Sequence, residues 1–525
     1  MTDFFSRPDL WVIAVYMLGM LGVAWYVSAG SRDAEGYTLG NRQLPGWAIG
    51  LSVLGTFTSS LTFLGGPGKI FREGDWNYLS FTVALPFSAL IAVIWFVPLY
   101  RRSVRLSAYE LLEQRFGYWA RLYADASYIL LQLLRVAMVL LLVALAVDDL
   151  LGWDVISTLV GLGVLVIIYD VLGGIRAVIW TDVVQVVVLC VGALWCLVVL
   201  VTDWPGGAGG FWSDIPAGSL SLGELASWDL AKSTFLVVFV YGLSENLRNY
   251  GTDQNYVQRV LAAPSDREAA KSIWIGALSY IPISLMIGLI GIGLAMNYRI
   301  ADSETAYATT SAATATGNTV VLPAGTTPDE VFPHFIQTEL PLGVSGLVIA
   351  AILAAAMSTV DSSLNSTSTV VLEDILRRFR RGEPRVPEII TLRISTVVLG
   401  VLGTGLAVAV YWRLGEASGT IMDQWWKYAG AAGGGMFGLF LLAWLLPRLP
   451  AWGALLATIT TFPVLLWGLL ATDLPADSPW KPLECRLHGN LVGVSGTLVV
   501  LLVGGTIWAA VLGGFVRAGS RYPRD

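Results

Sequence analysis

A polar face interrupts one of the apolar segments of this chain. The stretch 343–372 is long and apolar enough to cross a bilayer, yet it carries Ser358, Asp361, Ser362 and Asn365. At helical spacing these four residues are i, i+3, i+4 and i+7, so they share one side of a helix. Hydrocarbon penalises such groups unless something polar faces them. A small hard cation is the natural occupant, because oxygen ligands suit it and the carboxylate matches its charge.

Helix packing is a second explanation for the hydroxyls on this face. Small polar side chains commonly join membrane helices, and Ser and Thr can also donate to their own i−4 carbonyls. Asp361 favours the cation, because a carboxylate at membrane depth indicates a functional site by default.

The composition places these residues in a polytopic helical membrane protein. Of 525 residues, 55% are hydrophobic and only 13% are charged, against about a quarter in soluble proteins. With two histidines, and three cysteines at no metal-ligand spacing, no catalytic constellation is expected, so the chain is not expected to be an enzyme. Thirteen segments are expected to span the membrane: 10–29, 44–71, 76–100, 123–147, 155–172, 177–201, 234–260, 273–296, 343–372, 389–410, 426–446, 452–470 and 491–516.

The basic residues predict an orientation. Most of the 32 Lys and Arg fall on one side of the expected membrane, in clusters at 101–121, 377–393 and 517–524. The positive-inside rule therefore puts the N-terminus outside and the C-terminus in the cytoplasm. We expect a multi-pass protein of the plasma membrane, a bacterial inner membrane, in contact with lipid and not with nucleic acid.

Two of the expected spans carry interruptions. The second, 44–71, has Gly55, Thr58 and other small polar residues in its middle, and the seventh, 234–260, has a polar cluster around Gly242 and Gly251. Broken helices at corresponding places, five spans apart, are typical of inverted-repeat transporters. Unwound backbone at membrane depth survives only where it lines a cavity or is buried. The alternative for each span alone is a glycine-rich packing seam.

Five motifs together resemble a known family. They are YTLGNRQLPGWAIGLSVLGTFTSS, SAYELLEQRFG, YDVLGGIRAVIWTDVVQ, YGTDQNYVQRVLAA and AAAMSTVDSSLNSTSTVVLEDI. The chain resembles the solute:sodium symporters, which include sodium/glucose, sodium/proline, sodium/sialic acid and sodium/monocarboxylate transporters. The resemblance implies an all-α, LeuT-like fold with a 5+5 inverted-repeat core. We expect one transmembrane domain over 1–525, with an extra helix at 10–29, halves spanning 44–260 and 234–446, and extra helices at 452–516.

The resemblance also implies sites for Na⁺. One would use backbone carbonyls and hydroxyls of Gly55, Thr58, Ala355, Ser358 and Thr359. A second sodium or proton site would use Asp182, Asp361 and Ser362. Asp361 departs from relatives, which commonly have Ser or Thr there, and two facing carboxylates would bind a cation tightly or share a proton. The alternative for Asp182 is an ion pair with Arg176.

A solute site is expected at mid-membrane depth. Its candidates are Ser59, Thr62, Phe81, Arg135, Asn246, Asn249, Tyr250 and Trp426. Arg135 lies halfway through its span, and its planar fork suits a carboxylate on the solute. The alternative is a structural ion pair with Glu245 or another buried acid. Phe81, Ser279 and Trp426 stand where sugar-transporting relatives have polar residues, which argues against a glucose-type site.

These observations predict a sodium-coupled symporter that imports a small organic solute by alternating access. Three alternatives stay open: a sodium/sugar symporter with a different kind of site, a proton-coupled symporter, and a solute sensor that does not transport.

Overall fold

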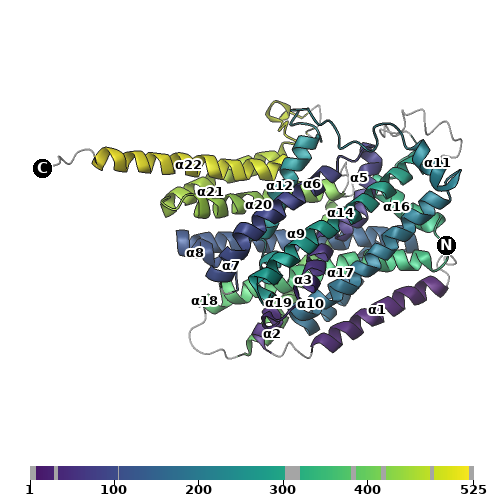
Figure 1. Ribbon diagram of the computed structural model, residues 1–525, viewed down its shortest axis with the longest axis horizontal. Helices are drawn as coiled ribbons and strands as arrows, with labels where there is room; N and C mark the ends of the chain where they lie inside the picture. The colour runs from purple at the N-terminus through teal and green to yellow at the C-terminus, as the bar shows by residue number, and fades with distance from the viewer. Residues whose placement is uncertain are drawn as a thin grey trace.

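The computed structural model describes residues 7–28, 33–104, 106–301, 320–379, 386–414, 421–472, 474 and 478–519, without the side chains of Leu172 and of 513–519. Long helices form one bundle, in which α1 lies on one side and α21 and α22 lie on the opposite side (Figure 1). The first half contains α1 (Arg7–Ser28), α2 (Ala34–Leu39), η1 (Gly40–Arg42), α3 (Gly46–Phe57), α4 (Ser60–Phe63), α5 (Gly65–Glu73), α6 (Leu79–Ile91), η2 (Ala92–Phe96), α7 (Val97–Ser103), α8 (Glu110–Phe116), α9 (Tyr118–Leu151), α10 (Val155–Thr202) and α11 (Gly207–Asp214).

The second half begins with a second interrupted helix. It contains α12 (Phe235–Thr252), α13 (Gln254–Ala262), α14 (Asp266–Asn297), β1 (Tyr298–Ile300), β2 (Val320–Leu322), α16 (Pro328–Thr338), α17 (Val344–Val370), η4 (Val371–Leu376), α18 (Arg377–Phe379), α19 (Glu388–Leu414), α20 (Ile421–Leu445), α21 (Ala451–Leu470), η5 (Lys481–Leu483) and α22 (Leu491–Gly519). The two strands pair in parallel, with Tyr298 opposite Val320 and Ile300 opposite Leu322.

Each expected span is largely helical where the structure describes it. Ten of the described helices are long and apolar enough to cross a membrane, and the bent pair Gly46–Phe57 and Ser60–Glu73 makes an eleventh. The other two expected spans are the short apolar helix Val155–Val171 and the pair α12 and α13. Spans five and six share the label α10 but are two helices that meet at Gly174, where the backbone is not helical (φ 59°, ψ −174°).

The two predicted helix breaks are present, but one lies elsewhere than expected. Span two bends by 59° between α3 and α4, at Thr58 (φ −93°, ψ 65°) and Ser59 (φ −75°, ψ 172°). Span seven breaks at Asp253 (φ −82°, ψ 116°), and not at Gly242 or Gly251. Those glycines allow close packing instead, because a Cβ at Gly242 would lie 2.8 Å from Phe81 Cα.

Helix α17 occupies the middle of the bundle. It packs against α1, α3, α4, α9, α10, α13 and α19, and all but one of the residues from Ser345 to Val370 are buried. A helix that is covered all round can keep polar groups at membrane depth, because they face protein and not lipid. The Ser and Asp residues of α17 therefore point at neighbouring helices.

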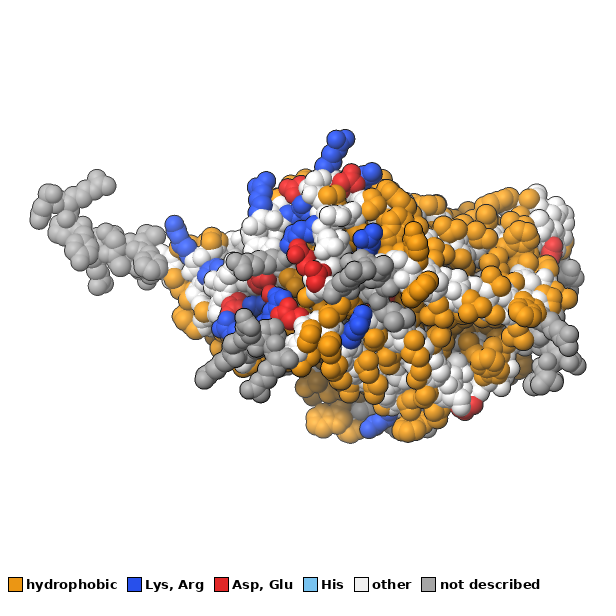
Figure 2. Space-filling model, turned by 90° about the horizontal axis from the view of Figure 1, so that it is seen from below, with side chains coloured by type: hydrophobic (Ala, Val, Ile, Leu, Met, Phe, Trp, Pro, Cys, Tyr) orange, Lys and Arg blue, Asp and Glu red, His pale blue; other side chains and the backbone are white. Residues whose placement is uncertain are grey.

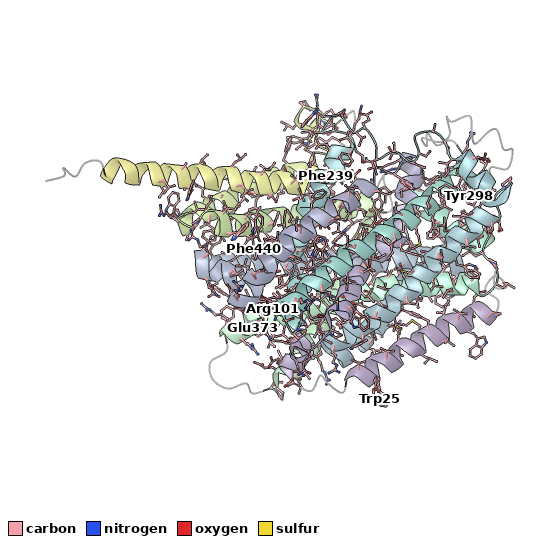
Figure 3. The ribbon with its side chains drawn as sticks, viewed as in Figure 1. Trp25, Arg101, Phe239, Tyr298, Glu373 and Phe440 are labelled. Atoms are coloured by element: carbon pink, nitrogen blue, oxygen red, sulfur yellow. The ribbon has the colours of Figure 1, made fainter. Side chains whose placement is uncertain are left out.

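Charged side chains gather at one end of the molecule. Figure 2 shows Lys, Arg, Asp and Glu clustered there, while hydrophobic side chains cover much of the remaining face. Arg101 and Glu373 lie at this end and Tyr298 lies far from it (Figure 3). Arg101 pairs with Asp266 at 2.6 Å, Arg121 with Glu113 at 2.5 Å, and Arg377 with Glu388 at 2.6 Å. The side chains of the predicted basic cluster at 517–524 lie outside the described part.

Candidate functional site

Gly55 and Ser358, which are distant in sequence, meet in the core. A Cβ built on Gly55 would lie 2.8 Å from Ser358 Oγ. Because α3 ends at Phe57, the carbonyls of its last turn lose their regular helical donors. Thr58 is fully buried, and its hydroxyl has no hydrogen-bond partner among the described residues. The break thus brings polar backbone of span two against the hydroxyl-bearing face of α17.

The other predicted sodium ligands lie on the same stretch of α17. Thr359 Oγ1 donates to the Ala355 carbonyl at 3.0 Å, which leaves lone pairs on both oxygens. Ser358 and Thr359 are each about 1% exposed. The structure therefore gathers Gly55, Ala355, Ser358 and Thr359 around the interface between α3 and α17, with Thr58 at the adjoining break.

Asp182 is held by three donors on three other helices. Ser358 Oγ donates to its Oδ1 at 2.5 Å, Ser52 Oγ donates to its Oδ2 at 2.5 Å, and Arg259 Nη2 lies 3.1 Å from Oδ2. The predicted alternative partner, Arg176, is wrong, because the ion pair is made by Arg259 of α13. The spacing within span six could not reveal a partner from a helix that is distant in sequence.

Asp361 and Ser362 lie next to this ion pair. Ser362 Oγ accepts a hydrogen bond of 2.6 Å from Arg259 Nη2, and Asp361 Oδ1 accepts one of 2.6 Å from the Ser362 N–H. Asp361 Oδ2 has no hydrogen-bond partner among the described residues, although the side chain is fully buried. Arg259 thus neutralises Asp182 and leaves Asp361 as the carboxylate that a further cation or proton could satisfy.

A cavity of about 80 Å³ lies beside the break in span two. It lies among α3, α4, α6, α9, α12, α13, α14, α17 and α20. Six of the eight predicted solute residues line it: Ser59, Thr62, Phe81, Arg135, Asn249 and Trp426. The other two do not. Asn246 is buried without a side-chain partner in the described part of the chain, and Tyr250 packs against Phe57 with ring centroids 5.9 Å apart.

Aromatic rings make up much of the cavity wall. The rings are those of Phe57, Tyr78, Phe81, Tyr241, Tyr256, Tyr280, Trp425 and Trp426. Trp426 stacks with Tyr78 (6.1 Å, 1°) and with Phe81 (6.1 Å, 12°). Sequence reasoning missed most of these rings because aromatic residues are common in membrane spans. One usable signal was the i, i+4, i+8 spacing of Tyr241, Glu245 and Asn249 on one face of α12.

The buried charges at the cavity pair differently from the expectation. The alternative to a solute carboxylate for Arg135 was Glu245 or another buried acid, but Glu245 Oε2 accepts from Arg248 Nε at 2.9 Å. Arg135 Nη2 lies 3.4 Å from Asp253 Oδ2, and its guanidinium lies 5.5 Å from the Trp425 ring. Arg135 therefore does pair with a buried acid, but that acid is Asp253 and not Glu245. Arg135 also lines the cavity.

An ion-pair cluster joins α5 to α20 beside the same cavity. Lys69 is fully buried, and its Nζ lies 2.7 Å from both Glu73 Oε1 and Asp423 Oδ1. Arg72 Nη2 lies 2.5 Å from Asp423 Oδ2. Lys69 Nζ also lies 5.1 Å from the Trp426 ring, so this cluster touches the cavity wall. The spacing of charges along the chain does not indicate the partner on α20.

Comparison with known proteins agrees with this geometry. A model of the sodium:solute symporter family matches residues 37–461. The sodium/sialic acid symporter SiaT of Proteus mirabilis is 32% identical over 465 residues, which cover 88% of this chain and 90% of that protein. The human sodium-coupled monocarboxylate transporter 1 is 28% identical over 481 residues, which cover 90% of this chain and 74% of that protein.

Solved structures confirm the predicted fold. A substrate-bound, outward-open Na⁺-coupled sialic acid symporter superposes with a TM-score of 0.82 at 29% identity, covering 97% of this chain and 98% of the other. Mhp1, a nucleobase-cation-symport-1 transporter, superposes with a TM-score of 0.59 at 14% identity, covering 91% and 95%, which supports the fold alone. The chain is a multi-pass membrane protein with a LeuT-like fold, and it belongs to the sodium:solute symporter family, whose members couple sodium to the transport of small organic solutes.

Proposed function

We propose that this symporter imports a compact solute bearing a carboxylate, together with Na⁺, through the cavity beside the break in span two. The observation that carries this proposal is Arg135. Its guanidinium is buried in α9, lines the cavity, and has Asp253, at 3.4 Å, as its hydrogen-bond acceptor within the described chain. A buried guanidinium offers five donors, so it can still hold both oxygens of a carboxylate.

The proposed sodium ligands are the carbonyls of Gly55, Thr58 and Ala355 and the hydroxyls of Ser358 and Thr359. The contact between the Gly55 position and Ser358 supports this set. Thr359 also lines the cavity, so the ion site and the solute site share α17. Sodium would hold α3 against α17 and favour one state of an alternating-access cycle. The effect of sodium on solute affinity must then equal the effect of solute on sodium affinity.

The cavity favours a compact acid over a polyhydroxylated sugar acid. Its volume is about 80 Å³, and eight of its seventeen lining side chains are aromatic, four of them tyrosines. Each buried sugar hydroxyl without a partner would cost about 1–3 kcal/mol. The proteins most similar to this chain include both sialic acid symporters and monocarboxylate transporters. We propose that the solute of this chain resembles a monocarboxylate more than a sialic acid.

Uptake into proteoliposomes tests the proposal. Pyruvate, benzoate and N-acetylneuraminate would be offered with and without a sodium gradient. We expect sodium-dependent uptake of pyruvate or benzoate, and its loss in Arg135→Gln when the variant keeps its unfolding temperature. Uptake by Arg135→Gln with unchanged solute affinity would refute the carboxylate contact, and preference for N-acetylneuraminate would refute the compact solute.

A proton is the second candidate for the coupled ion, at Asp361. The specific observation is the buried Asp361 Oδ2 without a partner in the described chain. Uptake driven by a pH gradient in the absence of sodium, and abolished in Asp361→Ser, would favour the proton. Uptake that depends on sodium and survives in Asp361→Ser would refute it.

We also propose that the charged end of the bundle faces the cytoplasm of a bacterial inner membrane. The ion-paired arginines of α7, α9 and α18 support this orientation. The N-terminus would then be outside and the C-terminus inside, with 44–260 and 234–446 spanning the inverted halves of a single domain. Labelling of cysteines introduced at Arg102 and at Trp228 from the two sides of right-side-out vesicles tests the orientation.

A further inference from the structure

Asp253 occupies the break in span seven. Its backbone ends α12, and its side chain caps α13 by accepting the Asn255 N–H at 2.9 Å on Oδ1. The side chain is fully buried. A short polar residue is well suited to this place, because it satisfies an N–H that the start of a helix leaves without a partner.

The same carboxylate also faces α9. Gln132 Nε2 lies 3.4 Å from Oδ1 and 3.3 Å from Oδ2, and Arg135 Nη2 lies 3.4 Å from Oδ2. Gln132 and Arg135 are three residues apart, so they lie on one face of α9. Asp253 therefore joins α9 to the start of α13 through these two side chains.

The pair between Arg135 and Asp253 is loose for a buried ion pair. Bonds between nitrogen cations and carboxylates usually measure about 2.7–2.9 Å. Lys69 reaches its two partners at 2.7 Å, and Arg259 reaches Asp182 at 3.1 Å. At 3.4 Å, the Arg135 pair is the longest among the buried ion pairs of the described residues. Arg135 lines the cavity and Asp253 does not, so a solute can approach the guanidinium without meeting Asp253 first.

Helix α13, which Asp253 caps, also contacts the proposed cation site. Arg259 of α13 pairs with Asp182 and donates to Ser362. Gln258 of α13 donates to Asn365 Oδ1 at 3.1 Å and to Thr369 Oγ1 at 3.3 Å. One short helix therefore has its N-terminus held by the counter-ion of Arg135 and its body bound to α17.

We propose that Asp253 is a positioning residue, the counter-ion that holds Arg135 until the carboxylate of the solute replaces it. This inference rests on the proposed carboxylate solute. When the solute takes over Arg135, Asp253 loses its charged partner on α9, and the start of α13 is then held to α9 by Gln132 without an ion pair. Departure of the solute returns Arg135 to Asp253. The exchange links occupancy of the cavity to the break in span seven and, through α13, to α17.

The substitution Asp253→Asn tests the charge of this side chain separately from its role as a helix cap. Asparagine caps helices as well as aspartate does, so the start of α13 is kept while the competing charge is removed. We expect the half-saturation concentration for sodium-driven benzoate uptake to fall about fivefold or more. The maximal rate should also fall, because no counter-ion remains to displace the acid. A residue that only stabilises the fold would not produce this opposite movement of affinity and rate.

Three further measurements control the test. Benzamide has the shape of benzoate without its charge. It should inhibit benzoate uptake by Asp253→Asn no more strongly than it inhibits uptake by the wild type. In the background of Arg135→Gln, where uptake is expected to be lost, Asp253→Asn should bring no gain in the affinity for benzoate measured by equilibrium binding. Both variants leave Arg135 without its charged partner, but Asp253→Ala, which also removes the cap, should lower the unfolding temperature further than Asp253→Asn.

The outcomes separate this inference from the proposed function. If the wild type takes up benzoate or pyruvate with sodium, but Asp253→Asn leaves affinity unchanged or weakens it, the counter-ion role is overturned and the proposed function stands. If the gain persists in Arg135→Gln, the role is likewise overturned. If the wild type takes up none of pyruvate, benzoate and N-acetylneuraminate, the carboxylate proposal fails and this inference fails with it.

Discussion

Ser358 Oγ on α17 donates a hydrogen bond of 2.5 Å to Asp182 Oδ1 on α10. The same oxygen lies 2.8 Å from where a Cβ on Gly55 would stand. Because its proton is given to Asp182, the hydroxyl can present lone pairs toward the broken end of α3. The carboxylate therefore orients one proposed sodium ligand without having to bind the ion itself.

Replacing Gly55 by alanine should weaken sodium binding. The added methyl would meet Ser358 Oγ at 2.8 Å and Val186 Cγ2 at 3.2 Å, so α3 and α17 must move apart. Overpacking of this kind costs about 1–3 kcal/mol. If the free energy of sodium binding is reduced by this amount, the sodium concentration for half-maximal uptake rises roughly tenfold. Sodium titration of solute uptake measures it.

Gly161→Ala is the matched control for this substitution. A Cβ at Gly161, in the first part of α10, would meet nothing within 4 Å. Its sodium dependence should equal that of the wild type. Equal sodium dependence in Gly55→Ala as well would show that the interface between α3 and α17 does not hold the ion.

Neutralising Asp182 should destabilise the protein strongly. Asp182→Asn leaves the Arg259 guanidinium, which is about 1% exposed, without its charged partner. Breaking a buried ion pair costs about 3–5 kcal/mol. Asp229→Asn, at the exposed pair with Lys232, should cost less than about 1 kcal/mol. Thermal unfolding in detergent compares the two variants, and an equally small effect for both would contradict the buried role of Asp182.

The sequence predicted the fold and the outline of the cation site because two simple constraints act there. Polar oxygen atoms cannot face lipid, and helical spacing decides which residues share a face, so Ser358, Asp361 and Ser362 pointed to a protein-facing stripe on α17. The clustering of Gly and small polar residues around Thr58 similarly indicated a break in span two.

The ion-pair partners of the buried charged residues could not be predicted from helical spacing. Spacing says nothing about which helices meet, so Arg259 could not be chosen over Arg176 for Asp182, nor Asp253 over Glu245 for Arg135. The break in span seven was expected near glycine, but an aspartate that caps the next helix makes it. Glycine in a membrane helix also serves the close packing of neighbouring helices.

Removing the carboxylate that bridges α5 and α20 should open the cavity on that side. Asp423 binds both Lys69 and Arg72, whereas Glu73 binds Lys69 within α5. We therefore expect Asp423→Asn, and not Glu73→Gln, to speed the labelling of a Ser59→Cys reporter by an impermeant maleimide severalfold. The reporter needs a background in which Cys190, Cys196 and Cys485 are replaced. Equal labelling in both variants would show that this cluster does not close the cavity.

The Asp329 carboxyl should make stability depend on pH. Asp329 lies at the start of α16, outside the membrane-spanning segments. Burial raises its pKa to about 6, and the hydrogen bond from the Ile421 N–H offsets this only in part. Between about pH 4 and pH 6 the folded protein keeps a proton that the unfolded chain has lost. The contribution of Asp329 to stability therefore falls as the pH rises through this window.

Asp329→Asn keeps an acceptor for the Ile421 N–H and removes the titration. The variant should gain stability over the wild type as the pH rises from 4 to 6, by about 3 kcal/mol at neutral pH. Asp154 supplies a control of opposite sign, because hydrogen bonds from Ser157 lower its pKa. Asp154→Asn should lose stability relative to the wild type as the pH rises toward about 4, below the window of Asp329, because the lowered pKa of Asp154 lies under the ordinary value of about 3.9. Unfolding temperatures measured from about pH 3 to pH 7 compare the two, and a difference between Asp329→Asn and wild type that does not change with pH would contradict the buried carboxyl.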